Sequence, residues 1–181
     1  MRKRFGEVTQ HVYHDHADVR RFIIEFELNA ADRPIVVLGD SVAEMARFPS
    51  ELCGHPVVNA GIGGATITEL DRIASRLLVG RVLSLIVIVA GTNDAKSSAI
   101  VADYSHLLAT LKDQPVLAVS ATKFDRVNQL TRDAASSSRV RYADVRFSEF
   151  LPDDVHPSAA GYRSWMPSVI AAIHEQCDRG K

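Results

Sequence analysis

The sequence contains little cysteine, and its two cysteines, Cys53 and Cys177, lie far apart in the chain. Two cysteines cannot form the disulfide framework typical of small secreted domains, and no Asn-x-Ser/Thr glycosylation acceptor is present. We therefore expect two free thiols rather than a redox pair. A cytoplasmic location follows from the same absences.

Long apolar runs are also missing. The longest one, Leu85 to Ala90 with its immediate flank, is far shorter than the ~20 residues needed to cross a bilayer. At the N-terminus, Arg2, Lys3 and Arg4 are followed by mixed polar residues rather than by the apolar segment of a signal peptide. The sequence thus predicts a protein without a membrane span.

The sequence also has almost no excess of one charge over the other. The formal net charge is -1, which provides no general attraction to nucleic acid or anionic lipid. Hydrophobic residues make up 46% and charged residues 24% of the chain, as in ordinary globular proteins. One domain over residues 1–181 is expected, because a chain of this length can bury roughly 70% of its unfolded surface around one core.

Short apolar runs alternate with longer amphipathic ones, which is the pattern of parallel strands joined by helical crossovers. The short runs are nearly continuous and rich in β-branched residues, so they suit strands covered on both faces. The sequence therefore predicts an α/β fold, a three-layer sandwich with a five-stranded parallel sheet. The expected strands are Ile35 to Leu38, Pro56 to Val58, Leu85 to Ala90, Val116 to Ser120 and Val140 to Ala143.

A helical extension of about 30 residues is predicted before the first strand, with a helix from about Val12 to Leu28. Its apolar residues Val19, Phe22, Ile23 and Phe26 recur at helical spacing. We expect this face to pack on the chain's own sheet. The alternative is that it faces a second copy, but a homo-oligomer is not indicated.

Another helix is expected after Thr66, because Glu69 three residues later completes a capping box. Further helices are expected over Ser98 to Leu111, over Asp125 to Ser137 and from Ser158 onward. Pro167 lies inside the last of these, where it removes a backbone donor and clashes with the preceding turn. A kink or break is therefore expected near Met166.

Three polar motifs follow predicted strands. They are Gly39-Asp40-Ser41, the glycine-rich block from Asn59 to Gly64, and Gly91-Thr92-Asn93-Asp94. Because the carboxyl ends of parallel strands meet at one edge of the sheet, these motifs should lie side by side. Each motif taken alone also fits an ordinary turn, and the glycines also fit a phosphate-binding loop.

A fourth motif, Asp153-Asp154-Val155-His156-Pro157, comes more than a hundred residues after Ser41. A serine hydroxyl is a poor nucleophile unless a base removes its proton, and a histidine is the better base when a carboxylate orients it. Ser41, His156 and Asp153 match these three roles.

These four blocks, in this order, resemble the SGNH, or GDSL-type, hydrolase family from Ile35 to Pro157. The resemblance implies a flavodoxin-like SGNH hydrolase fold, with Ser41 as nucleophile and His156 as base, oriented by Asp153. It also implies an oxyanion hole formed by the backbone N–H groups of Ser41 and Gly64 and by the side-chain amide of Asn93. No cofactor and no metal are implied.

Two neighbouring residues are alternatives to these assignments. Gly63 precedes Gly64, which is preferred because it matches the family spacing from Asn59. Asp154 follows Asp153, which is preferred because it stands three residues before the histidine.

The residues together predict a serine hydrolase that cleaves a small-molecule carboxylic ester through an acyl-enzyme. The short segment between Ser41 and Asn59 leaves no room for a large lid, so small acyl groups such as acetyl are favoured. The same fold and site also suit an acyltransferase, a thioesterase or a lysophospholipase. A noncatalytic ligand-binding module is the alternative from another class, and the presence of Ser41, Asp153 and His156 together argues against it.

The remaining histidines do not indicate a metal site. His11, His14 and His16 lie near Asp15 and Asp18, but their spacing is not that of a helical zinc pair with a third ligand. We expect a solvated polar segment there.

Overall fold

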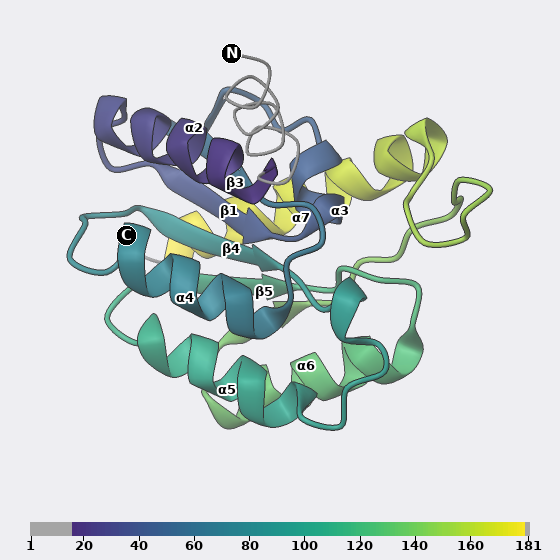
Figure 1. Ribbon diagram of the computed structural model, residues 1–181. Helices are drawn as coiled ribbons and strands as arrows, with labels where there is room; N and C mark the ends of the chain where they lie inside the picture. The colour runs from purple at the N-terminus through teal and green to yellow at the C-terminus, as the bar shows by residue number, and fades with distance from the viewer. Residues whose placement is uncertain (1–15, 180–181) are drawn as a thin grey trace, which may run out of the picture.

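The computed structural model describes residues 16–179, which form one six-stranded sheet between two layers of helices (Figure 1). The strand order is β2-β3-β1-β4-β5-β6, and every pairing from β3 to β6 is parallel. The strands are β1 Ile35–Gly39, β2 Glu51–Leu52, β3 His55–Gly61, β4 Leu85–Val89, β5 Val116–Val119 and β6 Arg141–Ala143. The predicted five parallel strands are confirmed, and the short β2 adds an antiparallel edge to β3.

The helices cover both faces of the sheet. They are α2 His16–Ala30, α3 Ser41–Met45, α4 Ile67–Leu77, α5 Ile100–Thr110, α6 Asp125–Ser137 and α7 Ala159–Arg179, with a 3-10 turn, η1, at Thr92–Asp94. Apolar residues of α2, α4, α5 and α6 pack on one face, and those of α3 and α7 on the other. Figure 1 shows α4 and α5 in front of the sheet and α7 behind it. The predicted three-layer α/β sandwich is therefore confirmed.

The order in which the strands join the sheet reverses at β1, which lies between β3 and β4. Side chains alternate along these parallel strands, so Val36 and Leu38 enter one core layer while Ile35 and Val37 enter the other. Helix α3 follows β1 and helix α5 follows β4, and these two helices cover opposite faces of the sheet. The loops after β1 and β4 therefore diverge at the central switch point, where ligands bind in open α/β sheets. Ser41 follows β1 and Asn93 follows β4 at this point.

The expected capping box is present at the start of α4. The Thr66 side chain accepts a hydrogen bond from the Glu69 backbone N–H at 3.3 Å, and the Glu69 carboxylate accepts one from the Thr66 backbone N–H at 2.8 Å. These bonds satisfy two N–H groups that have no partner inside the helix. They define the point where the glycine-rich loop ends.

The expected orientation of the first helix is wrong. Ile24 and Leu28 are the buried residues of α2, whereas Phe22 and Phe26 are 72% and 68% exposed. The Arg20 side chain donates to the carbonyls of Asn59 and Gly61, which orients the helix with the opposite face toward the sheet. Residues 12–15 of the predicted helix lie outside the described residues.

Of the kink or break expected near Met166, the break is wrong, because α7 continues through Pro167. Pro167 is exposed, and so is Arg163, whose carbonyl loses its helical donor, so water can solvate that carbonyl. On the other side of the helix, Trp165 and Val169 are fully buried against the sheet. Tertiary packing therefore outweighs the local cost of the proline.

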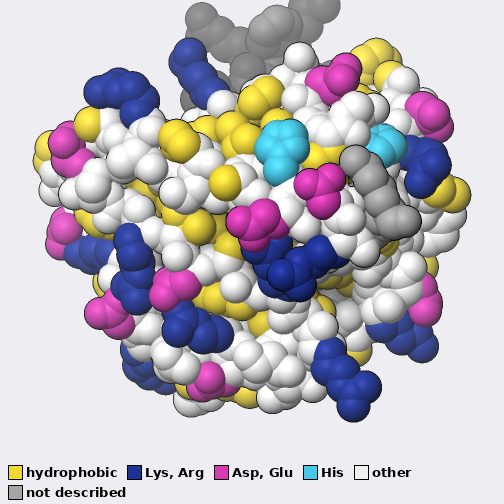
Figure 2. Space-filling view, turned by 180° about the vertical axis from the view of Figure 1, so that it is seen from behind, with side chains coloured by type: hydrophobic (Ala, Val, Ile, Leu, Met, Phe, Trp, Pro, Cys, Tyr) yellow, Lys and Arg dark blue, Asp and Glu magenta, His cyan; other side chains and the backbone are white. Residues whose placement is uncertain are grey.

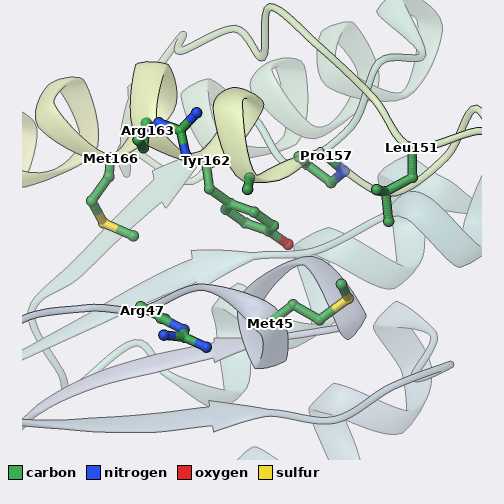
Figure 3. Close-up of a pocket in the computed structure, with 8 residues that line it drawn as sticks. Met45, Arg47, Leu151, Pro157, Tyr162, Arg163 and Met166 are labelled. Atoms are coloured by element: carbon green, nitrogen blue, oxygen red, sulfur yellow. The ribbon is translucent and has the colours of Figure 1, made fainter.

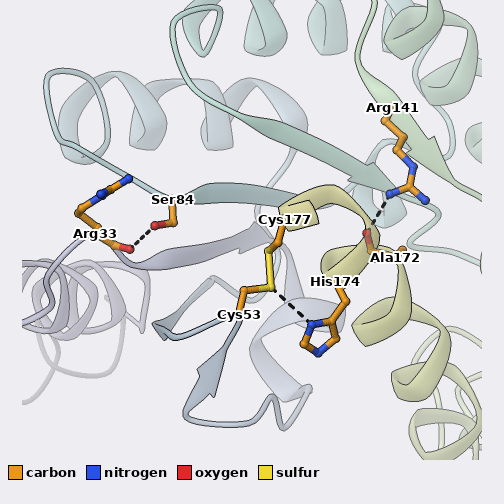
Figure 4. Close-up of a disulfide and its surroundings, with 7 residues drawn as sticks. All are labelled: Arg33, Cys53, Ser84, Arg141, Ala172, His174 and Cys177. Atoms are coloured by element: carbon orange, nitrogen blue, oxygen red, sulfur yellow. Dashed lines mark hydrogen bonds between the residues drawn. A yellow bond between two sulfur atoms is a disulfide. The ribbon is translucent and has the colours of Figure 1, made fainter. Parts of the chain in front are cut away.

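The prediction of two free thiols is wrong as well. Cys53 and Cys177 form a disulfide bond across a sequence separation of 124 residues, with a Cα–Cα distance of 6.5 Å (Figure 4). Cys53 lies in the turn between β2 and β3, and Cys177 lies near the end of α7, which packs beside that hairpin. The bond removes the cysteine argument for a cytoplasmic location.

The face opposite to that of Figure 1 carries acidic, basic and hydrophobic side chains intermingled over its described part, with no large area of one sign (Figure 2). Across residues 16–179, none of the helices combines the length and the apolar character needed to cross a membrane.

Candidate active site

Ser41 is the first residue of α3, directly after the end of β1. Asp40 is the N-cap of this helix and is fully buried. Its carboxylate accepts hydrogen bonds from the backbone N–H of Val42 at 2.9 Å and of Thr92 at 3.1 Å. Burial raises the pKa of Asp40 to about 6, although these hydrogen bonds oppose the rise. Asp40 thus joins the loop after β1 to the loop after β4.

Ser41, His156 and Asp153 form a continuous chain of side-chain hydrogen bonds. Ser41 Oγ lies 2.9 Å from His156 Nε2, and His156 Nδ1 lies 2.7 Å from Asp153 Oδ2. The other oxygen of Asp153 accepts from the backbone N–H groups of Val155 and His156, each at 3.0 Å. The hydrogen bond from His156, followed by these backbone bonds, lowers the pKa of Asp153 to about 2. The structure thus brings together the three side chains predicted to act together.

Asp154 is oriented differently from its neighbour. Its carboxylate is 77% exposed and pairs with Lys123, away from the imidazole. Asp154 also has a positive φ of 56°, which turns the backbone between the two aspartates. Of the two carboxylates, Asp153 is therefore the one in contact with His156.

The loop that carries His156 is closed at its base by main-chain hydrogen bonds. Leu151 N–H donates to the His156 carbonyl at 2.8 Å, and Ser158 N–H donates to the Glu149 carbonyl at 3.0 Å. Phe150 and Pro157 form an isolated antiparallel bridge between these bonds. The imidazole is thus held on a short, closed loop between β6 and α7.

The glycine-rich loop lies against α3. The Gly63 N–H donates to the carboxylate of Glu44, so this donor is already occupied. Gly64 has a φ of +78° and is exposed, and its N–H has no hydrogen-bond partner among residues 16–179. Of the two adjacent glycines, only Gly64 therefore has a backbone donor available to a ligand.

Asn93 lies beside this loop in η1. Its side-chain amide donates one hydrogen bond to the Ala65 carbonyl at 2.9 Å, which leaves the second amide proton for another acceptor. The next residue, Asp94, is buried and accepts from the Ile67 N–H at 3.1 Å. Burial raises the pKa of Asp94. These contacts attach the loop after β4 to the start of α4.

A cavity of about 590 Å³ is lined by residues of α3, of the loop that carries His156 and of α7 (Figure 3). Its lining residues are Met45, Arg47, Leu151, Pro157, Ala159, Tyr162, Arg163 and Met166. Met45 stands one helical turn after Ser41, and Pro157 directly follows His156. The Tyr162 hydroxyl donates to the Val42 carbonyl at 2.9 Å, which attaches α7 to α3. The cavity is thus lined by residues of the same helix as Ser41 and of the same loop as His156.

Several residues hold the site in place through contacts that the sequence did not predict. The Asn59 amide donates to the carbonyls of Ala43 at 2.8 Å and Ala46 at 3.1 Å, and its oxygen accepts from the Gly61 N–H at 2.9 Å. Glu44 accepts from His16 at 2.9 Å and pairs with Arg20 at 3.3 Å. Their polar side chains gave no signal, because every partner except Gly61 is distant in the sequence.

His16 is the one member of the histidine segment that the structure describes, and it contacts Glu44 rather than only solvent. His11, His14 and Asp15 lie outside the described residues. Within residues 16–179, no group of three His, Cys, Asp or Glu side chains is arranged to hold a metal ion.

Comparison with known proteins identifies the family. Residues 36–164 match the model of the GDSL-like Lipase/Acylhydrolase family. The chain belongs to this family. The match covers all four sequence blocks, from the strand before Ser41 to the first turns of α7, and the family resemblance predicted from them is confirmed. No curated protein sequence matches the chain.

Solved structures share the fold at low sequence identity. A Streptococcus pneumonia protein proposed to be a platelet activating factor is 18% identical, with a TM-score of 0.74 over 94% of this chain and 99% of its own. A GDSL-like lipase from Bacteroides thetaiotaomicron is 16% identical, with a TM-score of 0.63 over 89% and 98%. An acetyl xylan esterase from Geobacillus stearothermophilus is 15% identical, with a TM-score of 0.61 over 81% and 95%. At these identities the likeness establishes the fold.

Proposed function

We propose that this acylhydrolase-family chain is a serine esterase that cleaves carboxylic esters with small acyl groups through an acyl-enzyme on Ser41. The observation that carries the proposal is the hydrogen-bonded chain from Ser41 Oγ through both nitrogens of His156 to Asp153. An imidazole in this position can accept the serine proton while the carboxylate stabilises the imidazolium that forms.

In the first step, neutral His156 takes the proton of Ser41 as Oγ attacks the ester carbonyl carbon. The tetrahedral intermediate then collapses, the bond to the alcohol oxygen breaks, and His156 gives its proton to that oxygen. Water next attacks the acyl-enzyme, again losing its proton to His156, and Ser41 leaves with that proton. Asp153 remains ionised throughout, as expected from its lowered pKa of about 2.

The negative oxygen of each tetrahedral intermediate is stabilised best by hydrogen-bond donors that already point at its position before the reaction. The proposed donors are the backbone N–H groups of Ser41 and Gly64 and the side-chain amide of Asn93. The free N–H of Gly64 and the second amide proton of Asn93 support this assignment. Removing one donor of this kind typically costs about 2.7 to 4 kcal/mol in the barrier.

The preference for small acyl groups rests on the short connection after the nucleophile. The chain between Ser41 and Asn59 forms only the five-residue α3 and the two-residue β2 before β3 begins, so it supplies no lid. One structural relative is an acetyl xylan esterase, which makes acetyl esters the first substrates to test. Acyltransferase, thioesterase and lysophospholipase activities would use the same residues, and a substrate panel separates them.

The decisive experiment combines active-site labelling with hydrolysis. The wild type should react covalently with a fluorophosphonate probe and hydrolyse nitrophenyl acetate faster than longer acyl esters or a thioester. Ser41→Ala should abolish labelling, and Ser41→Ala and His156→Ala should each lower kcat by about three orders of magnitude or more.

Ser137→Ala is a matched control, because Ser137 is exposed at the end of α6, near the opposite edge of the sheet. It should label and turn over like the wild type. Ester hydrolysis that survives in Ser41→Ala would overturn the proposal and favour a noncatalytic or differently catalytic site.

A further inference from the structure

The cavity beside the nucleophile combines apolar walls with two guanidinium groups and no acidic side chain. Met45, Leu151, Tyr162 and Met166 supply the apolar surface. Figure 3 shows Arg47 on the α3 side and Arg163 on the α7 side. Both arginines thus line the cavity, one from each side.

Neither arginine is committed to another contact. Among residues 16–179, no hydrogen bond or ion pair engages the guanidinium of Arg47 or Arg163, and both side chains are exposed. Arg20, Arg132 and Arg141, by contrast, each have acidic partners. Two unpaired guanidinium groups at one apolar cavity form a site for an anion, because this group binds carboxylate and phosphate oxygens with paired N–H donors.

The position of the cavity indicates which part of the ester it receives. Its walls come from α3, from the His156 loop and from the start of α7, whereas Gly63 and Gly64 line a separate hollow near α4. The alcohol oxygen must lie close to His156 Nε2 to receive a proton when it leaves. Pro157, directly after that histidine, is one of the lining residues, which favours this cavity as the place of the departing alcohol.

We propose that this cavity binds the alcohol part of the ester, and that Arg47 and Arg163 select alcohols carrying an anionic group at the end of an apolar body. The inference rests on the proposed esterase function and names its substrate class. Both arginines are specificity residues at the cavity rim, since neither contacts the reacting atoms.

A pair of acetate esters with the same leaving phenol tests the proposal. Acetoxyphenylpropanoate carries a carboxylate on the alcohol part, and the corresponding amide is neutral. The wild type should show a kcat/KM about tenfold higher for the anionic ester, a modest factor because the arginines are exposed to water. Added salt should reduce this preference. The double variant Arg47→Gln/Arg163→Gln should bring the ratio of the two kcat/KM values close to one.

Arg33→Gln is the matched control, because Arg33 precedes β1 at the opposite edge of the sheet and does not line the cavity. It should keep the wild-type ratio. Equal kcat/KM values for the two esters in the wild type, or a ratio unchanged in the double variant, would overturn the anion proposal. If the wild type hydrolysed neither ester and did not react with the fluorophosphonate, the proposed esterase function itself would be overturned.

Discussion

Asp153 and Asp154 are neighbours of the same chemistry, yet they make different contacts. Asp153 lies against His156 Nδ1, and Asp154 pairs with Lys123. Spacing from the histidine favours Asp153, but only the backbone turn at Asp154 shows that the second carboxylate points elsewhere. The roles of such adjacent residues depend on local dihedral angles, which composition does not reveal.

Replacement of each aspartate should have unequal effects on catalysis. Asp153→Asn should lower kcat by about 10²- to 10⁴-fold, because an amide cannot stabilise the imidazolium and disturbs the histidine tautomer. Since the pKa of Asp153 is lowered to about 2, its carboxylate is already ionised above pH ~4, and its own titration adds no pH dependence to the deficit there.

Asp154→Asn is the control for this comparison and should keep kcat within about twofold, because an exposed ion pair contributes little. Steady-state kinetics of both variants between pH 5 and pH ~8 provides the measurement. Equal losses in the two variants would contradict the assignment of Asp153.

At the scale of elements, the site depends on how α3 is held. This five-residue helix is too short to be stable alone, so its position comes from its neighbours. Asp40 caps its start, and the Asn59 side chain bonds the carbonyls at its end. A Cβ at Gly61 would lie 2.2 Å from the Glu44 N atom, so glycine is needed where β3 meets the helix.

Asn59 should therefore contribute measurably to stability. Asn59→Ala should lower the free energy of unfolding by about 1 to 3 kcal/mol, because two carbonyls and one N–H each lose one hydrogen bond. Asn59→Asp should be less stable still at neutral pH, since a carboxylate would face the Ala43 and Ala46 carbonyls. Urea unfolding monitored by circular dichroism measures both. An Asn59→Ala midpoint equal to that of the wild type would refute this role.

In the whole molecule, α7 runs from the carboxyl ends of the strands to their amino ends. It begins beside His156 and ends near Cys177, which is bonded to Cys53 in the β2–β3 turn. The disulfide therefore lies at the amino ends of the strands, away from Ser41, His156 and Asp153. It closes a loop of 124 residues. The longer the closed loop, the more conformational entropy the unfolded chain loses, so a long loop favours a large stabilisation.

Reduction of this disulfide should lower stability with little change in activity. The wild type should lose about 2 to 4 kcal/mol of unfolding free energy on adding a reductant. The double variant Cys53→Ser/Cys177→Ser should resemble the reduced protein and respond to no reductant. Guanidinium unfolding with and without reductant provides the comparison. Identical midpoints for the oxidised and reduced wild type would contradict a stabilising disulfide.

The alternation of strands and helices, the capping box at Thr66 and the order of the four motifs could all be predicted from the sequence, because these signals involve residues close together in the chain. The folded structure was needed to see which face of α2 is buried, why α7 continues through Pro167, and that Cys53 meets Cys177. It also showed the Gly63 N–H bonded to Glu44 and the two arginines beside the cavity. Each depends on contacts between segments distant in sequence, which arise only when the layers pack together.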